Sequence, residues 1–369
     1  MQAISGFVTN SFSIRGLCLG AGKGYHPLKR RKPMKIILDV LGGDAAPAAP
    51  IEGAIAALKK NADLNLILVG PKPAIEEAFT KAGIDASRYE IIHAEEAVLN
   101  TDHPANFLRT KPNCSMALAF QALKEREDVD AFLGAGPTGA MLSGCIFKVG
   151  RIPGVKRPAL LATLPTKNGG LVRLTDAGAN MDCKPEYLVQ FAKMANEYLK
   201  VLGIEKPRIG LLSVGMEEGK GNELTKTVFP LLKEDPDLNF IGNVEGDKVL
   251  DGICDLVVSD GFAGNVFVKS LEGGAYFVSD LFKEAVMGNP WRKIGALFQL
   301  RGLKNVKKPF KYANDSCAPL LGCKKLVVKC HGKSKALNFA SAIEEVMTYA
   351  KEHLVEKVAA AIEATPLGE

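Results

Sequence analysis

Short runs of apolar residues alternate with longer amphipathic segments along most of this chain. The short runs are almost continuously hydrophobic, as strands buried on both faces of a sheet are. They predict strands over residues 35–40, 65–70, 89–92, 130–134, 159–163, 171–175, 208–214, 238–242, 255–259 and 326–330. Apolar residues at helical spacing predict helices over residues 50–60, 73–83, 114–126, 138–148, 185–202, 223–233 and 265–286. This alternation predicts an α/β fold with a doubly wound, mainly parallel sheet, in a single domain over residues 34–369.

A final helix is predicted over residues 335–364, where apolar side chains recur every three or four positions and form one stripe. The stripe consists of Leu337, Ile343, Val346, Ala350, Leu354, Val358 and Ile362. We expect it to pack against the core or against a second subunit.

Residues 287–312 differ from the rest of the chain in composition. They contain seven Lys or Arg residues, no acidic residue, and the large apolar residues Trp291, Leu297, Phe298, Leu300, Leu303 and Phe310. A basic amphipathic segment with an aromatic anchor is typical of contact with a membrane surface or an acidic partner. An ordinary solvated helical excursion is the alternative interpretation.

The excess positive charge of the chain is concentrated at its N-terminus. The formal net charge is +6, but residues 1–33 carry six basic residues and no acid, so residues 34–369 hold 41 basic and 41 acidic side chains. The neutral remainder argues against a general nucleic-acid-binding protein, which needs a net basic face. We expect residues 1–33 to be a disordered tail or the product of a start site placed too early, with a transit peptide as a weaker alternative.

The chain carries no obvious export or metal-binding signal. No stretch approaches the ~20 apolar residues of a transmembrane helix, and the N-terminus lacks the apolar run of a signal peptide, so a cytoplasmic protein is expected. Eight scattered cysteines without a C-x-x-C pair predict reduced thiols. Cys317, Cys323, Cys330 and His331 are separated by gaps that match no usual zinc spacing, so we predict no metal.

Glycine-rich turns follow five of the predicted strands, and ligands in open α/β sheets bind beyond the carboxyl ends of strands. The turns are residues 41–47, 135–139, 176–186, 215–226 and 260–265. Each places glycines where the backbone can approach a ligand and then opens a helix, whose N-terminal amides attract anions. We therefore expect the five turns to converge on one site.

Polar side chains in these turns form a set that suits an oxyanion. Positive charge comes from Lys184 and Lys220. Amide donors, and carboxylates that can orient them, come from Asn180, Asn222, Asn265, Asp176, Asp182 and Asp260. Asp182 can in addition cap the helix that follows it. The pattern predicts a phosphate cradle centred on residues 215–226.

Two other enzyme classes fit the sequence poorly. Residues 134–139 match the dinucleotide pattern G-x-G-x-x-G, but no Asp or Glu occurs between Asp130 and Asp176 to bind a ribose, so we predict no nicotinamide or other cofactor. There is no G-x-S-x-G nucleophile elbow. His331 is the one histidine placed like a site residue, at a predicted strand end, and a buried structural histidine is the alternative.

Seven segments, taken in order along the chain, resemble those of the bacterial phosphate acyltransferases of phospholipid synthesis. They are residues 40–44, 136–140, 176–186, 215–226, 240–245, 260–265 and 318–322. The resemblance extends from Met34 to near the C-terminus. It implies a fold related to those of phosphate acetyltransferases and isocitrate-type dehydrogenases.

Members of that family convert the fatty acyl thioester of acyl carrier protein and inorganic phosphate into acyl phosphate. A membrane enzyme then uses the acyl phosphate to acylate glycerol-3-phosphate. The resemblance therefore implies acyl carrier protein, phosphate and this membrane acyltransferase as partners. It also implies a homodimer that visits the inner membrane surface through residues 287–312.

The resemblance implies catalytic roles for Lys220 and Asn265. Because phosphate is itself the nucleophile, the protein has to supply only its positioning and donors for the developing oxyanion. We expect Lys220, helped by Lys184, to bind phosphate, and Asn265 with Asn222 to polarise the thioester carbonyl. The further predicted substrate-binding residues are Asn180, Asp44, Thr138 and Asp260.

The chain departs from the family pattern at three places. Ala45 stands where the family usually has His, Pro137 where it usually has Asn, and Ser316 and Cys317 where it usually has two glycines. Two alternatives therefore stay open. One is a short-chain phosphate acyltransferase that uses coenzyme A, and the other is a noncatalytic protein that recruits acyl carrier protein to the membrane.

Overall fold

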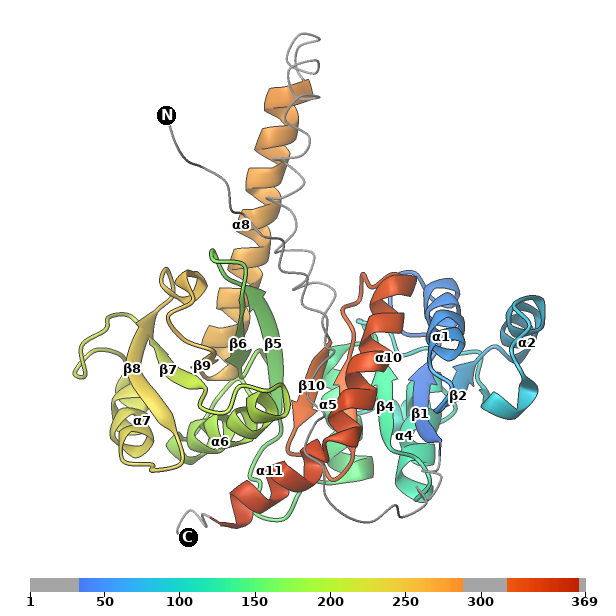
Figure 1. The fold of residues 1–369 in the computed structure, drawn as a ribbon, viewed down its shortest axis with the longest axis horizontal. Coiled ribbons are helices and arrows are strands. Elements are labelled where there is room, and N and C mark those ends of the chain that lie inside the picture. Colours follow the sequence, from blue (N-terminus) through green and yellow to red (C-terminus); the bar gives the residue numbers. More distant parts are fainter. Residues whose placement is uncertain (1–32, 288–316, 365–369) are drawn as a thin grey trace, which may run out of the picture. The chain divides into compact units, whose positions relative to one another are not determined.

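One mixed sheet of eleven strands runs through the computed structural model, which describes residues 33–287 and 317–364 (Figure 1). Seven of its ten neighbouring strand pairs are parallel, which confirms the predicted mainly parallel sheet. From one edge to the other, the strands are β3 (Tyr89–His93), β2 (Leu64–Gly70), β1 (Met34–Asp39), β4 (Ala131–Gly134), β11 (Leu326–Lys329), β10 (Ala318–Leu321), β5 (Ala159–Pro165), β6 (Leu171–Thr175), β9 (Leu256–Val258), β7 (Arg208–Ser213) and β8 (Asn239–Glu245).

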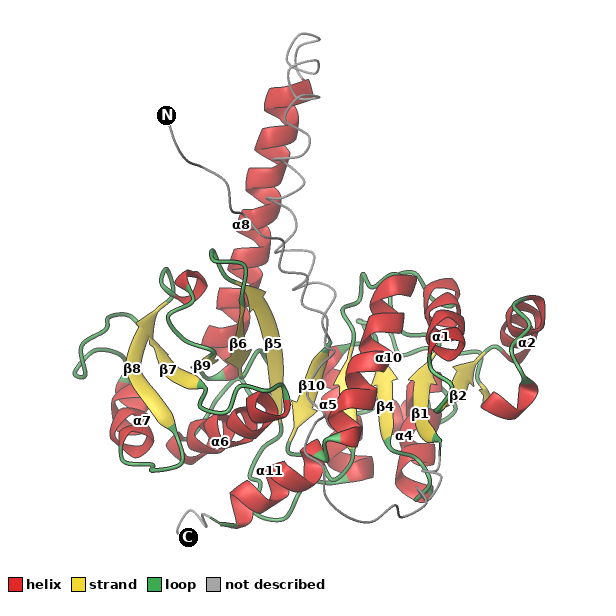
Figure 2. Ribbon diagram, in the orientation of Figure 1, coloured by secondary structure: helices red, strands yellow, loops and turns green. Residues whose placement is uncertain are grey.

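Helices cover both faces of this sheet, so the doubly wound architecture is also confirmed (Figure 2). In β1, for example, Ile36 and Leu38 enter one hydrophobic core, whereas Ile37 enters the other. The first core is covered by α1 (Ala48–Lys60), α2 (Lys72–Lys81), α6 (Pro185–Val201), α7 (Glu223–Lys233), α10 (Ala336–Lys351) and α11 (Leu354–Glu363). The second is covered by α4 (Ser115–Glu125), α5 (Thr138–Gly144) and the first half of α8 (Gly261–Met287).

The sheet changes direction between its two halves, and this separates turns that we expected to converge. Strand β5 is antiparallel to both neighbours, β10 and β6, and β10 is also antiparallel to β11. As a result, β1, β4 and β11 run one way, whereas β6, β9 and β7 run the other way. The carboxyl ends of the two sets lie at opposite ends of the sheet. The five turns therefore fall into two groups, and a single site lined by all five stays a prediction.

The C-terminal helix was predicted as one element and is two. His353 adopts a left-handed conformation, with φ 54°, and this residue separates α10 from α11. Leu337, which we placed on the buried stripe, is 75% exposed, and Phe339 takes the buried position instead. Elements that the hydrophobic pattern did not predict are β10, α3 (Phe107–Thr110) and the short helical turns η1 (Ala86–Arg88) and η3 (Val249–Asp251). The helix predicted over residues 138–148 is α5 followed by the π-helical turn η2 (Cys145–Val149).

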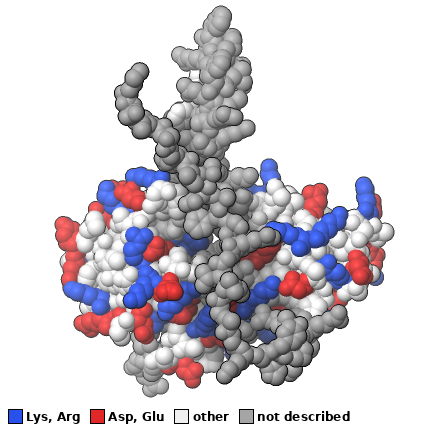
Figure 3. Space-filling view, in the orientation of Figure 1, with Lys and Arg blue, Asp and Glu red and all other residues white. Residues whose placement is uncertain are grey.

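Two regional predictions fall mostly outside the described residues. Of the predicted tail over residues 1–33, only Pro33 is described, and of the basic segment over residues 287–312, only Met287, the last residue of α8. None of the described helices is both long and apolar enough to span a membrane. Figure 3 shows basic and acidic side chains interspersed over the described part of the visible face, in keeping with the balanced composition of residues 34–369.

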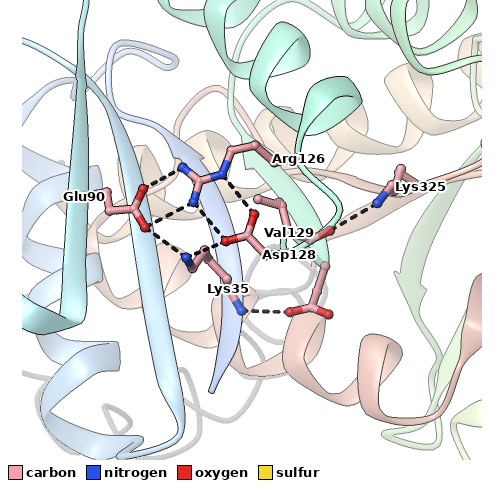
Figure 4. A network of polar contacts seen from close by, with 7 residues as sticks. Lys35, Glu90, Arg126, Asp128, Val129 and Lys325 are labelled. Atoms are coloured by element: carbon pink, nitrogen blue, oxygen red, sulfur yellow. Dashed lines mark hydrogen bonds and ion pairs between the residues drawn. The ribbon is translucent and has the colours of Figure 1, made fainter. Parts of the chain in front are cut away.

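A network of charged side chains joins β1, β3 and the loop before β4 (Figure 4). The Nζ atom of Lys35 lies 2.9 Å from Glu90 and 2.6 Å from Asp128, and the guanidinium of Arg126 contacts the same two carboxylates. The bonds from Arg126, followed by those from Lys35, hold the pKa of Asp128 well below its usual range. The pKa of Glu90 is lowered chiefly by Arg126.

We expect Arg126→Ala to lower the free energy of unfolding at neutral pH by about 1 kcal/mol, a small value because the network is half exposed. Carboxylates whose pKa is lowered by folding stabilise the fold above their usual values of 4.5 and 3.8, and this contribution is lost at lower pH. The variant should therefore lose less stability than the parent as the pH falls from 5 to 3. Denaturant titrations at several pH values measure both effects. Lys72→Ala, which removes a single exposed pair with Glu76 at 3.6 Å, is the control and should change neither.

Candidate active site

Three glycine-rich turns meet at the carboxyl ends of three adjacent strands, β6, β9 and β7. The turns are residues 176–184, 260–265 and 215–226, and we call this region the Lys220 end of the sheet. It contains Lys220, Asn265, Lys184, Asn180, Asn222 and Asp260, so six of the eight predicted site residues lie in neighbouring turns.

Asp176 organises the first of these turns from a fully buried position. Its Oδ1 atom accepts hydrogen bonds from the backbone amides of Leu160 (3.0 Å) and Ala179 (3.1 Å). Its Oδ2 atom accepts from both the backbone amide (2.6 Å) and the side-chain amide (2.9 Å) of Asn180. Burial raises the pKa of the Asp176 carboxyl, while these bonds favour its charged form. The carboxylate therefore fixes the path of the turn.

Asn180 is itself held by this arrangement. Its Nδ2 atom donates to Asp176 and also to the carbonyl oxygen of Pro158 at 2.7 Å, so both of its amide hydrogens have protein partners. The backbone carbonyl oxygen of Asn180 accepts a hydrogen bond from the backbone amide of Gly261 at 2.8 Å. Asn180 thus connects the first turn to the start of α8, and direct contact with a substrate stays a prediction.

The start of α8 is joined to the first turn by Asn265. The Nδ2 atom of Asn265 donates to the carbonyl oxygen of Ala177 at 3.0 Å, which leaves its second amide hydrogen and its Oδ1 atom for other partners. Asp260 precedes the helix, and its Oδ1 atom accepts a hydrogen bond from the backbone amide of Ala263 at 2.8 Å. A β-carbon on Gly178, where φ is +123°, would lie 2.5 Å from Asn265 Nδ2. This glycine is therefore needed for the two turns to meet.

Gly264 allows α8 to approach the backbone of the Asp176 turn, and we expect Gly264→Ala to be destabilising. The added β-carbon would overlap the carbonyl oxygen of Asp176 and lie 3.0 Å from Leu174. Because the first obstacle is backbone, the expected loss is about 1–3 kcal/mol of unfolding free energy. Thermal melts measure it. Gly274→Ala is the matched control, since its β-carbon meets nothing within 4 Å in the same helix and it should be neutral or stabilising. Equal melting temperatures for the two variants would contradict this account.

The third turn presents Lys220 to solvent. Lys220 is exposed and makes no ion pair with any residue in the described parts of the chain. Asn222 caps α7, where its Oδ1 atom accepts from the backbone amide of Thr225 at 2.9 Å, and the capping leaves its side-chain amide hydrogens free. Gly221, with φ +112°, lies between these two residues and lets the turn pack against Thr225 and Ser213.

Asn243 supports this turn and was not among the predicted site residues. It lies on β8, is almost fully buried, and donates from Nδ2 to the carbonyl oxygen of Glu217 at 2.8 Å. The signal was present in the sequence, because asparagine is depleted in strands and an asparagine near the end of a strand often has a local hydrogen-bonding role.

Lys184 immediately precedes α6, where Pro185 begins the helix. Its side chain is exposed and, like that of Lys220, forms no ion pair within the two described ranges. The Lys220 end therefore combines two free ammonium groups with two asparagine side chains that retain amide hydrogens. Such a set can bind an anion and donate hydrogen bonds to a second oxygen nearby.

Asp44 and Thr138 lie at the other end of the sheet, which we call the Asp44 end. Its turns, residues 41–47, 135–139 and 331–334, contact one another: the backbone amide of Asp44 donates to Gly332 O at 2.7 Å, and a β-carbon on Gly42 would lie 2.8 Å from Gly136 N. Thr138 is the first residue of α5. The structure therefore does not bring these two predicted residues together with the other six.

Helix α8 connects the two ends of the sheet. Asn265 lies in its first turns at the Lys220 end, and Glu272 Oε1 lies 4.0 Å from Nε2 of His331 at the Asp44 end. At about 1.5 Å per residue, these two side chains are roughly 10 Å apart along the helix. Burial lowers the pKa of His331, which favours the neutral imidazole. No three His, Cys, Asp or Glu side chains gather as a metal site among residues 33–287 and 317–364.

Comparison with known sequences places these turns in a family. The model of the family described as "Fatty acid synthesis protein" matches residues 34–357. A phosphate acyltransferase from Clostridioides difficile (strain 630) is 42% identical over 326 residues, which cover 88% of this chain and 95% of that protein. Another, from Caldanaerobacter subterraneus subsp. tengcongensis, is 44% identical over 333 residues, which cover 90% of this chain and 98% of that protein.

Solved structures agree at the level of the fold. EutD phosphotransacetylase from Staphylococcus aureus matches with a TM-score of 0.52 at 13% identity, over 87% of this chain and 94% of that one. A branched-chain phosphotransacylase from Enterococcus faecalis V583 matches with a TM-score of 0.52 at 15% identity, over 86% and 99%. The predicted relation to phosphate acetyltransferase folds is confirmed. From the family match and the sequence relatives together, the chain belongs to the fatty acid synthesis protein family, whose curated members are named phosphate acyltransferases.

Proposed function

We propose that this protein transfers a fatty acyl group from the thioester of acyl carrier protein to inorganic phosphate, giving acyl phosphate for the acylation of glycerol-3-phosphate. The observation that carries the proposal is the grouping of Lys220, Asn222 and Asn265 in neighbouring turns. The hydrogen bond from Asn265 to Ala177 and the capping bond of Asn222 fix two of these side chains without using all their amide hydrogens. The family match, which covers residues 34–357, supports the acyltransferase assignment.

In the proposed reaction, phosphate is the nucleophile. A phosphate oxygen forms a bond to the carbonyl carbon of the thioester, the carbon–sulfur bond breaks, and sulfur leaves as a thiolate that takes a proton from solvent. Lys220, with Lys184, binds the phosphate, and Asn265 with Asn222 donates to the carbonyl oxygen as negative charge develops on it. Donors that are already fixed when this charge develops are the most effective ones. Asp176, Asn180 and Asn243 hold the turns in place.

The proposal includes partners at the membrane. The second half of α8 exposes Tyr276, Phe277, Val278, Leu281 and Phe282 and ends at the start of the basic segment over residues 287–312. An apolar helix surface followed by a basic amphipathic segment suits contact with a second subunit and with an anionic membrane surface. We therefore propose a homodimer with peripheral membrane association, which delivers acyl phosphate to a membrane glycerol-3-phosphate acyltransferase.

One assay tests the proposed function against both alternatives. The purified full chain is supplied with isotopically labelled phosphate and either palmitoyl-acyl carrier protein or acetyl-coenzyme A, and acyl phosphate is detected by transfer of the label to the acyl product. We expect product from the palmitoyl donor. Product from acetyl-coenzyme A alone would identify a short-chain enzyme instead. A complete lack of product, combined with measurable binding of acyl carrier protein, would favour the noncatalytic recruiting protein.

A further inference from the structure

Large apolar side chains are exposed around the Lys220 end of the sheet. Each of its three turns contributes one, namely Met181, Met216 and Phe262, and Val214 and Val266 lie directly beside two of these turns. Val214 is 81% and Phe262 63% exposed. Glycine-rich turns need no large apolar residues for their own folding. Exposed apolar side chains that lie close together on a protein surface often mark a binding site. We call these five residues the apolar rim.

The apolar rim crosses neighbouring strand ends. Met181 follows Asn180 and Phe262 follows Gly261, and the carbonyl oxygen of Asn180 accepts a 2.8 Å hydrogen bond from the amide of Gly261. On the next strand, Leu211 of β7 is paired with Val258 of β9. An extension of this parallel register by three residues would bring Val214 to the level of Gly261, the residue before Phe262. Three strands at a spacing of about 4.8 Å give the rim a width of roughly 10 Å.

The rim adjoins the groups that would handle the reacting atoms. Phe262 and Val266 flank Asn265 on the first turns of α8, and Val214 and Met216 lead directly into the turn that carries Lys220. A ligand whose anionic or carbonyl part is bound by Lys220 and Asn265 would therefore continue over an apolar surface. A long hydrocarbon chain attached to that carbonyl fits this arrangement, because its only favourable contact is with apolar side chains.

We infer that the apolar rim binds the acyl chain of the donor and makes the enzyme prefer long chains over short ones. This inference rests on the proposed function and names the part of the substrate that the rim contacts. Burying one methylene group contributes about a four-fold gain in affinity, so contact along even a few carbons produces a strong preference for chain length. The rim thereby distinguishes the donor without contacting the reacting atoms.

The test compares chain-length preference in rim variants and in a matched control. The value of kcat/KM is measured for the full chain with palmitoyl, octanoyl and acetyl groups on the same acyl carrier protein. Phe262→Ser and Val214→Ser are each expected to lower the ratio of palmitoyl to acetyl kcat/KM by about ten-fold, the effect of losing roughly half of a buried apolar side chain. Leu337→Ser, an exposed apolar position on α10, should leave the ratio unchanged.

Three results would overturn the inference. The ratio could stay constant in both rim variants, or kcat/KM could fall equally for all three donors, as a general disturbance of the turns would cause. The variants could also convert a dimer to a monomer in sedimentation experiments without changing the ratio, which would assign the rim to a second copy of the chain.

A binding measurement separates this inference from the proposed function: the affinity for palmitoyl-acyl carrier protein is measured by calorimetry without phosphate. If no donor yields acyl phosphate, the proposed function fails, and the loss or retention of this affinity in Phe262→Ser still decides the role of the rim.

Discussion

Replacing Lys220 by alanine is expected to lower kcat for acyl phosphate formation by about 100- to 1,000-fold, the usual cost of removing one fixed group that stabilises charge in a transition state. Lys220 is exposed and pairs with no acidic side chain in the described residues, so its charge is free to act on a ligand. The same exposure means that its loss should not affect folding. Steady-state kinetics with varied phosphate, together with thermal melts, measure both quantities.

Lys226→Ala provides the matched control, because this lysine lies in the same segment and is also exposed but belongs to the first turns of α7. It should retain nearly full activity. Lys220→Arg should recover part of the rate, since it keeps the charge but presents a different hydrogen-bonding geometry. Near-normal turnover of Lys220→Ala at saturating phosphate, together with an unchanged KM for phosphate, would show that this side chain neither binds the nucleophile nor stabilises the transition state.

The hydrophobic pattern was sufficient for most of the fold because long periodic segments report burial directly. It predicted α6 and α7 to within one residue at each end. It missed β10, whose four residues include Pro319 and give no alternation that can be recognised. It also extended the last helix through His353, because an apolar stripe continues across the break while the left-handed residue leaves no mark in periodicity.

The arrangement of the site could be predicted only in part, because strand direction is a property of pairing and not of composition. The turns after β6, β9 and β7 meet because these strands are parallel neighbours. The turns after β1 and β4 have the same glycine-rich character, yet the antiparallel β5 and β10 place them at the other end of the sheet. Nothing in residues 41–47 or 135–139 distinguishes these two cases.

This division also bears on the departures from the family pattern. Ala45 and Pro137 both lie in turns at the Asp44 end, whereas the turns that carry Lys220, Asn222 and Asn265 keep the pattern. The substitutions therefore lie outside the turns to which we assign the chemistry. Helix α8 links the two ends of the sheet, since Glu272 on this helix lies 4.0 Å from His331 at the Asp44 end.

Asn265→Ala is expected to reduce kcat by about 100- to 1,000-fold, because it removes a donor that we assign to the oxyanion formed at the thioester carbonyl. The same substitution breaks the 3.0 Å hydrogen bond to Ala177 O, which should cost about 1 kcal/mol of stability. The two effects are separable. A loss of chemistry appears in kcat at saturating phosphate and saturating donor, whereas a loosened turn appears in the melting temperature and in KM.

Asn265→Asp sharpens this distinction, since it keeps the size of the side chain but replaces the amide by a carboxylate that cannot donate to a carbonyl oxygen. It should be at least as inactive as Asn265→Ala, because negative charge beside a developing oxyanion is unfavourable. If both variants instead kept kcat within a few-fold of the parent and changed only stability and KM, Asn265 would be a positioning residue. The carbonyl would then have to be polarised from elsewhere at the Lys220 end, where the side-chain amide hydrogens of Asn222 and the ammonium groups of Lys220 and Lys184 are available as donors.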